Sequence, residues 1–230
     1  MIPTFGMLLG GIIAGIFNPG EKLISGTQHF AAGVVFAAVA IELLPHLGQG
    51  TNIWAMTIGF LAGLITMIGI KLLTEAIGHT HGGQSATPWG LISGVGIDLF
   101  IDGVLIGIAF LVGKQGGLLI TFALAIEVLF LGLSSAATLS GKQFNKLNTI
   151  LIVFGLGLLL PIGSVGGASL LQSLPPIYTS ALISFGVAAL LYLVTEELLT
   201  EAHEVEDTPL ITSSFFIGFL VILILEHMSA

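Results

Sequence analysis

Two aspartates, Asp98 and Asp102, lie in the middle of an otherwise nonpolar stretch that runs from Trp89 to Val112. The stretch is long enough to cross a bilayer, so both acids are expected near its centre. Each charged residue at the centre of a membrane helix costs about 2.5–3.5 kcal/mol on insertion scales. With a spacing of i and i+4, both carboxylates point from one face of the helix. Two acids that face the same way in hydrocarbon need a positive partner, either a metal ion or a proton.

The composition indicates a membrane protein. Of the 230 residues, 55% are hydrophobic and 8% are charged, and the mean hydropathy is +1.09; a polytopic membrane protein needs this much apolar sequence and a soluble core does not. The chain has no cysteine, which excludes disulfides, thiolate metal sites and cysteine nucleophiles. A net charge of −8 argues against nucleic acid as a partner and is compatible with cations.

Hydrophobic runs separated by short polar breaks predict an all-α polytopic membrane protein, with residues 1–230 forming a single transmembrane domain in the lipid bilayer. Eight transmembrane helices are expected near residues 2–17, 28–48, 52–77, 88–112, 117–139, 147–172, 176–201 and 210–228. Pro161 lies inside the sixth of these segments and predicts a kink or a break there.

The lysines predict an orientation in the cell membrane. With the N-terminus outside, Lys22, Lys71, Lys142 and Lys146 lie on or near the cytoplasmic side, and Lys114 lies outside. Positive residues favour the cytoplasmic side, so both termini are expected to be external.

Two internal sequence similarities, which we call echoes, indicate a repeat. The first echo appears when the chain is aligned with itself so that Phe30 falls on Phe185, because the segment Glu42-Leu43-Leu44 then falls on Glu197-Leu198-Leu199. This alignment pairs the second span with the seventh. Because the two spans are five apart in order, they run in opposite directions, which is the inverted-repeat plan of many secondary transporters.

The second echo adds a third acid to the central pair. It aligns the fourth span with the fifth and places Asp98 on Glu127 and Asp102 on Leu131. Under this pseudo-symmetry, Asp98, Asp102 and Glu127 face one another at mid-membrane, where such transporters bind substrate. Three carboxylates are hard oxygen ligands that suit Mn²⁺, Fe²⁺ or Mg²⁺, and Zn²⁺ also accepts them. The alternative is a polar cluster held by protonation and helix hydrogen bonds.

Three segments resemble the ZIP (Zrt-/Irt-like) family of divalent metal transporters. Residues 98–110 resemble the His-Asn-x-Pro-Glu-Gly motif of its fourth helix, with Asp98 in place of histidine and Asp102 in place of glutamate or aspartate. Residues 30–46 resemble its second helix, and residues 191–203 resemble a segment that ends in Glu-Leu-Ile-Pro-Glu-Ala-His. The resemblance implies a three-two-three inverted-repeat bundle of eight helices, external termini and transport of zinc, iron or manganese. It also allows a homodimer.

This chain departs from the family pattern at two positions. Leu131 stands where the fifth helix of the family brings a second ligand, and Leu160 stands where many bacterial members have a glutamate before the proline. The resemblance therefore implies about one metal site in place of two. The histidine-rich loop of the family is reduced to His79 and His81.

The remaining polar residues of the spans suggest a route for the ion. Glu42 and His46 lie one turn apart towards the outer end of the second span, and Glu197 and Glu201 do the same towards the inner end of the seventh, followed by His203. We expect the first pair at the entrance and the others at the exit, although long polar side chains near helix ends also reach for water. His29, Glu226 and His227 are expected at the membrane interface.

The metal transporter is weighed against two other classes. Residues 94–98 superficially resemble the Gly-x-Gly-Asp motif of an aspartyl intramembrane protease, but the two aspartates share one helix, whereas a protease dyad needs acids from two helices. We therefore expect no enzymatic activity and no cofactor, with a divalent cation as the transported substrate. The third class is a non-transporting metal sensor or subunit, which the leucines at positions 131 and 160 favour.

Overall fold

Helices make up almost all of the protein in the computed structural model, which describes residues 2–16, 20–48, 52–79, 88–142, 144–171, 175–206 and 208–229. The α-helices are α1 (Ile2–Ile16), α2 (Glu21–Ala38), α3 (Ile53–His79), α4 (Pro88–Val112), α5 (Lys114–Lys142), α6 (Lys146–Gly157), α7 (Leu159–Leu171), α8 (Pro176–Tyr192), α9 (Leu199–Ala202) and α10 (Pro209–Ser229). The described residues contain no β-strand. The prediction of an all-helical protein is therefore confirmed.

Three short elements of other helix types continue the long helices. A π-helix, η1 (Val39–Leu43), and a 3₁₀-helix, η2 (Leu44–Leu47), extend α2, and a second π-helix, η3 (Leu193–Leu198), joins α8 to α9. π-Helical turns are rare and occur mostly at functional sites.

Within the part of the chain that the structure describes, seven segments are long and apolar enough to cross a membrane. They are 21–47, 53–74, 90–111, 114–140, 146–169, 178–202 and 209–228. The first helix, α1, is apolar but has only 15 residues, which gives a length of about 22 Å at 1.5 Å per residue. On the outside of the bundle, α3 and α10 expose large apolar side chains such as Ile65 (67% exposed) and Leu210 (80% exposed), as lipid-facing helices do.

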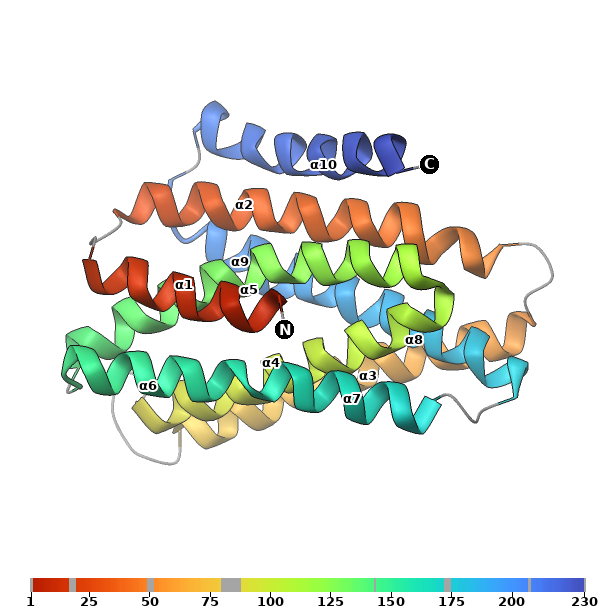
Figure 1. Ribbon diagram of the computed structural model, residues 1–230, viewed down its shortest axis with the longest axis horizontal. Helices are drawn as coiled ribbons and strands as arrows, with labels where there is room; N and C mark the ends of the chain where they lie inside the picture. Colours follow the sequence, from red (N-terminus) through yellow and green to blue (C-terminus); the bar gives the residue numbers. More distant parts are fainter. Residues whose placement is uncertain are drawn as a thin grey trace.

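The helices run roughly parallel or antiparallel along the long axis of the bundle (Figure 1). The most extensive packing joins α1 to α5, α4 to α7, α2 to α10 and α3 to α8. We name the two ends by their connections: the α5–α6 end, where α5 ends and α6 begins, and the α4–α5 end, where α4 ends and α5 begins.

Two boundaries differ from the expectation. The second span was expected to begin near residue 28, but α2 begins at Glu21 after an extended Gly20. Its polar first turns are stabilised by tertiary contacts, since the Ser25 hydroxyl donates to the carbonyl oxygen of Ala202 at 2.7 Å. The sixth span is divided into α6 and α7 at Leu158. The break fits Pro161, because proline has no N–H for the carbonyl four residues earlier, that of Gly157.

Candidate metal centre

Three carboxylates from two adjacent helices meet inside the bundle. Asp98 and Asp102 lie one turn apart on α4, and Glu127 lies on α5. Each residue offers one ligand oxygen, and these three oxygens all lie within 4.8 Å of one another. Asp102 and Glu127 are 1% and 2% exposed, and Asp98 is partly exposed. The structure thus brings together the three acids that the sequence pattern placed at mid-membrane.

Asp98, Asp102 and Glu127 form what we call the acid trio, and two of its oxygen atoms lack a hydrogen-bond partner among the described residues. The carboxyl groups of Asp102 and Glu127 are close enough to hydrogen-bond each other. Their other oxygens, Asp102 Oδ2 and Glu127 Oε2, are buried and have no hydrogen-bond partner among the residues that the structure describes. Buried polar atoms nearly always have a partner, so each exception needs an explanation.

A cation fits both the chemistry and the size of the acid trio. Hard divalent cations bind carboxylate oxygens at roughly 2.0–2.6 Å, so two oxygens on opposite sides of one ion are at most about 5 Å apart. The observed limit of 4.8 Å lies within that span. The three carboxylates can therefore contact a single ion after small side-chain movements, with water supplying further ligands.

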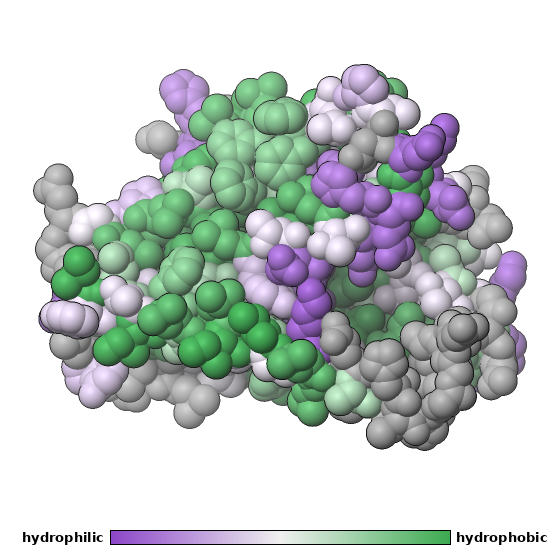
Figure 2. Space-filling model, turned by 180° about the vertical axis from the view of Figure 1, so that it is seen from behind, coloured by the Kyte–Doolittle hydropathy of each residue, from purple (hydrophilic) through white to green (hydrophobic). Residues whose placement is uncertain are grey.

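A cavity of about 280 Å³ reaches the acid trio from the α5–α6 end. It is lined by Asp98 and Glu127 together with Ile70, Lys71, Thr74, Gly94, Val95, Leu131, Leu193, Glu197, Leu198 and Glu201. Lys71 and Glu201 are exposed or partly exposed, so the cavity opens at the surface. Figure 2 shows hydrophilic side chains that reach from this end towards the middle of an otherwise largely hydrophobic face.

The predicted exit residues Glu197 and Glu201 both line this cavity. Glu197 lies deeper than expected, because its carboxyl group is close enough to hydrogen-bond that of Asp98. Glu201 lies nearer the surface, where its Oε2 accepts a hydrogen bond of 2.5 Å from Nε2 of Gln28. Four acids thus line one continuous cavity, with the buried Asp102 beside Glu127 at its closed end.

The predicted entrance residues lie in a different cavity, at the α4–α5 end. Glu42 and His46 line a cavity of about 650 Å³ together with Gly113, Lys114, Gln115, Gly116, Leu118 and Glu226. Buried apolar side chains occupy the intervening positions on α4 and α5, including Leu105, Ile106, Ile120 and Leu124. The structure therefore does not bring Glu42 and His46 to the acid trio.

His29 and His203, which do not line this second cavity, have structural contacts. His203 is not among the residues that line the first cavity; its Nδ1 contacts the carbonyl oxygen of Leu199. Its ring packs edge-on against His29, with 5.0 Å between centroids. The His29 side chain, which was expected at the membrane interface, is 1% exposed and therefore lies inside the protein. It is buried where α2 packs on α9. His81 lies outside the described residues.

Two residues at or beside the cavity were not predicted as site residues: Lys71 lines it, and Gln28 hydrogen-bonds the lining residue Glu201. Lys71 served only as an indicator of orientation, and Gln28 drew no attention. A signal for Gln28 does exist, because Ser25, Gln28 and His29 share one face of α2 and all three are buried. Buried polar residues on one helix face indicate polar partners on a neighbouring helix, which here is α9.

The two leucines that depart from the family pattern have different surroundings. Leu131 lines the cavity one helical turn from Glu127, so the cavity is apolar at the position of the second expected ligand. Leu160 is buried in the packing of α7.

No protein-family model matches this chain, and no curated protein sequence matches it. The fold and the site define a helical bundle with membrane-spanning character and a buried carboxylate group that suits a metal ion.

Proposed function

We propose that this protein is a ZIP-like membrane transporter of divalent cations of the zinc, iron or manganese class. The observation that carries the proposal is the acid trio, in which Asp98, Asp102 and Glu127 converge within 4.8 Å. Two of its buried oxygens lack a partner among the described residues. Desolvating several carboxylates at one point is unfavourable unless a cation compensates their charge.

One-sided access supports transport over a purely structural role. The cavity at the α5–α6 end reaches Asp98 and Glu127, whereas buried apolar residues separate the acids from the cavity at the α4–α5 end. In the orientation inferred from the lysines, the α5–α6 end faces the cytoplasm. The arrangement then corresponds to an inward-open state, and release would proceed past Glu197 and Glu201.

Repeated packing contacts support the inverted-repeat architecture. A Cβ at Gly63 of α3 would collide with the carbonyl oxygen of Phe185 of α8, and a Cβ at Gly218 of α10 would collide with that of Phe30 of α2. The first echo, which aligns Phe30 with Phe185, also aligns Gly63 with Gly218 and so relates one contact to the other. Inverted repeats of this kind let one repeat move against the other around a central site.

The helices that carry the acid trio also make a pair of glycine packing contacts that one of the echoes relates. Gly10 of α1 packs against the carbonyl oxygen of Leu129 of α5, and Gly163 of α7 packs against that of Phe100 of α4. The second echo, which aligns Asp98 with Glu127, also aligns Phe100 with Leu129. This agreement supports a repeat that relates α4 to α5, in which the acid trio would lie near the pseudo-symmetry axis.

Uptake of Mn²⁺, Zn²⁺ and Fe²⁺ by proteoliposomes that contain only this chain tests the proposal. We expect Asp102→Ala to abolish flux, because it removes a buried ligand. His81→Ala and Glu21→Ala, the second an exposed acid outside the cavity, should leave flux near wild type. Equal flux in Asp102→Ala and these controls would refute the site. Cation binding to the wild type without flux would identify the chain as a metal sensor or subunit instead.

A further inference from the structure

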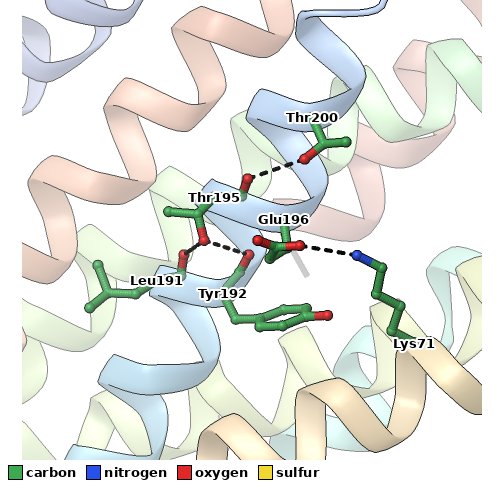
Figure 3. Close-up of polar contacts among 6 residues, drawn as sticks. All are labelled: Lys71, Leu191, Tyr192, Thr195, Glu196 and Thr200. Carbon is green, nitrogen blue, oxygen red and sulfur yellow. Dashed lines mark hydrogen bonds and ion pairs between the residues drawn. The ribbon is translucent and has the colours of Figure 1, made fainter.

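Two adjacent glutamates of one helix have opposite surroundings. Glu196 is 49% exposed and forms an ion pair with Lys71 of α3, with 3.1 Å between Oε2 and Nζ (Figure 3). Glu197 lines the cavity and is close enough to Asp98 for a hydrogen bond. Both residues lie in the π-helix η3.

The π-helical turn determines which of the two faces the cavity. A π-helix accommodates one extra residue per turn compared with an α-helix. One residue of an α-helix corresponds to a rotation of about 100°. If Leu193–Leu198 were α-helical, Glu196 would point into the cavity where Glu197 does now. Glu197 would then point away from Asp98. The helix type of this short segment therefore selects one glutamate for the cavity.

Two threonine hydroxyls donate to carbonyl oxygens in and next to the π turn, and that of Thr200 spans five residues. Thr200 Oγ1 donates to the carbonyl oxygen of Thr195, five residues earlier, at 3.2 Å. Thr195 Oγ1 donates to the carbonyl oxygen of Leu191 at 3.0 Å (Figure 3). Wider turns disrupt the ordinary i to i−4 backbone hydrogen bonds. A side-chain hydroxyl can then donate to a carbonyl oxygen that has lost its backbone N–H donor.

We propose that Glu197 is a fourth carboxylate ligand of the cation, and that Thr200 is a positioning residue that maintains the π turn presenting Glu197 in place of Glu196. This inference rests on the proposed cation site of Asp98, Asp102 and Glu127. It makes the π-helix η3, which continues α8, a direct participant in cation binding.

The related helix α2 shows an independent way of making the same turn. The first echo, which aligns Glu42 with Glu197, places Val39–Leu43, the π-helix η1, on 194–198 within η3. The same alignment places Pro45 on Thr200. Proline lacks an N–H and its ring clashes with the carbonyl four residues earlier, so it disfavours the α register. Proline at position 200 should therefore preserve the π turn that the Thr200 hydroxyl now stabilises.

Mn²⁺ binding to the purified full-length protein, followed by the loss of the free-ion electron paramagnetic resonance signal, tests the ligand. We expect Glu197→Gln to weaken binding by about tenfold or more, since a charged ligand is lost. Glu196→Gln is the matched control on the adjacent residue. The Lys71–Glu196 pair has side chains 41% and 49% exposed, so it contributes little to stability. Binding to Glu196→Gln should stay within about twofold of wild type.

A second set of variants tests the positioning role. Thr200→Val keeps the branched shape but removes the hydroxyl, and it should weaken Mn²⁺ binding by about tenfold, as loss of outer-shell support does. Thr200→Pro should bind Mn²⁺ more tightly than Thr200→Val and nearly as tightly as the wild type. Thr57→Val, which removes an ordinary i to i−4 hydroxyl bond on exposed α3, should have no effect. The combination of Glu197→Gln with Thr200→Val should bind no more weakly than Glu197→Gln alone.

The outcomes separate this inference from the proposed function. If the wild type binds no Mn²⁺ and Asp102→Asn changes nothing, the cation site itself is refuted. If the wild type binds Mn²⁺ but Glu197→Gln and Glu196→Gln bind equally well, Glu197 is not a ligand and only the further inference is lost. If Thr200→Pro binds as weakly as Thr200→Val, or if Thr200→Val weakens binding further in the absence of the Glu197 carboxylate, the positioning role is refuted. Should a Thr200 variant fail to fold, the two glutamine variants still decide the ligand.

Discussion

Gln28 of α2 donates a hydrogen bond of 2.5 Å from its Nε2 to Oε2 of Glu201 of α9. The amide is buried, whereas the carboxylate lies on the exposed side of the cavity that leads to the acid trio. The contact therefore fixes one carboxylate oxygen of a residue that lines the cavity. It ties the helix that carries Glu42 to the segment that carries the acids nearest the opening.

Replacement of Gln28 by leucine tests the role of this contact. Because Glu201 is exposed, its carboxylate can turn to water, so we expect the midpoint of thermal unfolding to change by only a few degrees. Cation flux into proteoliposomes should fall by about tenfold, since Glu201 no longer holds its place on the cavity wall. Equilibrium Mn²⁺ binding at the deeper acid trio should be unchanged. Wild-type flux in Gln28→Leu would show that Glu201 needs no positioning.

The sequence was sufficient for the helical class and for the convergence of the acids. Long apolar runs with short polar breaks define membrane-length helices because the bilayer fixes their length. The i, i+4 spacing of Asp98 and Asp102 places both on one helix face, and the echo between the fourth and fifth spans pointed to Glu127. Such signals are local or repeat along the chain, so they can be read without coordinates.

The contacts that depend on exact helix register were not predictable. The π turn η3 is accompanied by a hydrogen bond from the Thr200 hydroxyl to the carbonyl oxygen of Thr195. A threonine in an ordinary α-helix looks the same in the sequence. Without that turn, a helical wheel cannot decide between Glu196 and Glu197. Likewise, the early start of α2 depends on tertiary partners of Ser25 and Gln28. Periodicity carries no information about partners that lie near the other end of the chain.

Asp102→Asn should separate stability from cation binding. The substitution removes a buried carboxylate whose Oδ2 has no partner among the described residues, so the cation-free protein should be as stable as wild type or more stable. Mn²⁺ at 100 times its Kd stabilises the wild type by about 2.7 kcal/mol, which corresponds to roughly 5–10 °C in the unfolding midpoint. Asp102→Asn should lose this shift. A full Mn²⁺-dependent shift in the variant would contradict the assignment of Asp102 as a ligand.

Leu131→Asp tests whether the cavity accepts another ligand. Leu131 lines the cavity one turn from Glu127, as Asp102 lies one turn from Asp98. A carboxylate there should strengthen Mn²⁺ binding by about tenfold through added opposite charge. It should also destabilise the cation-free protein by about 1–3 kcal/mol through desolvation. Leu118→Asp, also on α5 but in the other cavity, should not change Mn²⁺ affinity. Equal affinity in both variants would show that the Leu131 side of the cavity is out of reach of the ion.

Gly10→Ala and Gly15→Ala form a matched pair on α1 that tests the close helix packing. A Cβ at Gly10 would collide with the carbonyl oxygen of Leu129, whereas a Cβ at Gly15 would have no atom within 4 Å among the described residues. Gly10→Ala should therefore force α1 away from α5 and destabilise the protein by about 1–3 kcal/mol, and Gly15→Ala should not. Thermal unfolding in one detergent provides the measurement.

The related contact between α4 and α7 gives the same comparison on the other side of the acid trio. Gly163→Ala would meet the carbonyl oxygen of Phe100, while a Cβ at Gly166 has no described atom within 4 Å. If the two contacts are equivalent parts of a repeat, Gly10→Ala and Gly163→Ala should lower stability by similar amounts, within about 1 kcal/mol. Each contact involves a helix that bears acids of the site, α5 or α4. Both variants should therefore reduce flux together with stability. A large loss in one and none in the other would show that the two helix pairs are packed independently, which would remove the packing argument for the repeat.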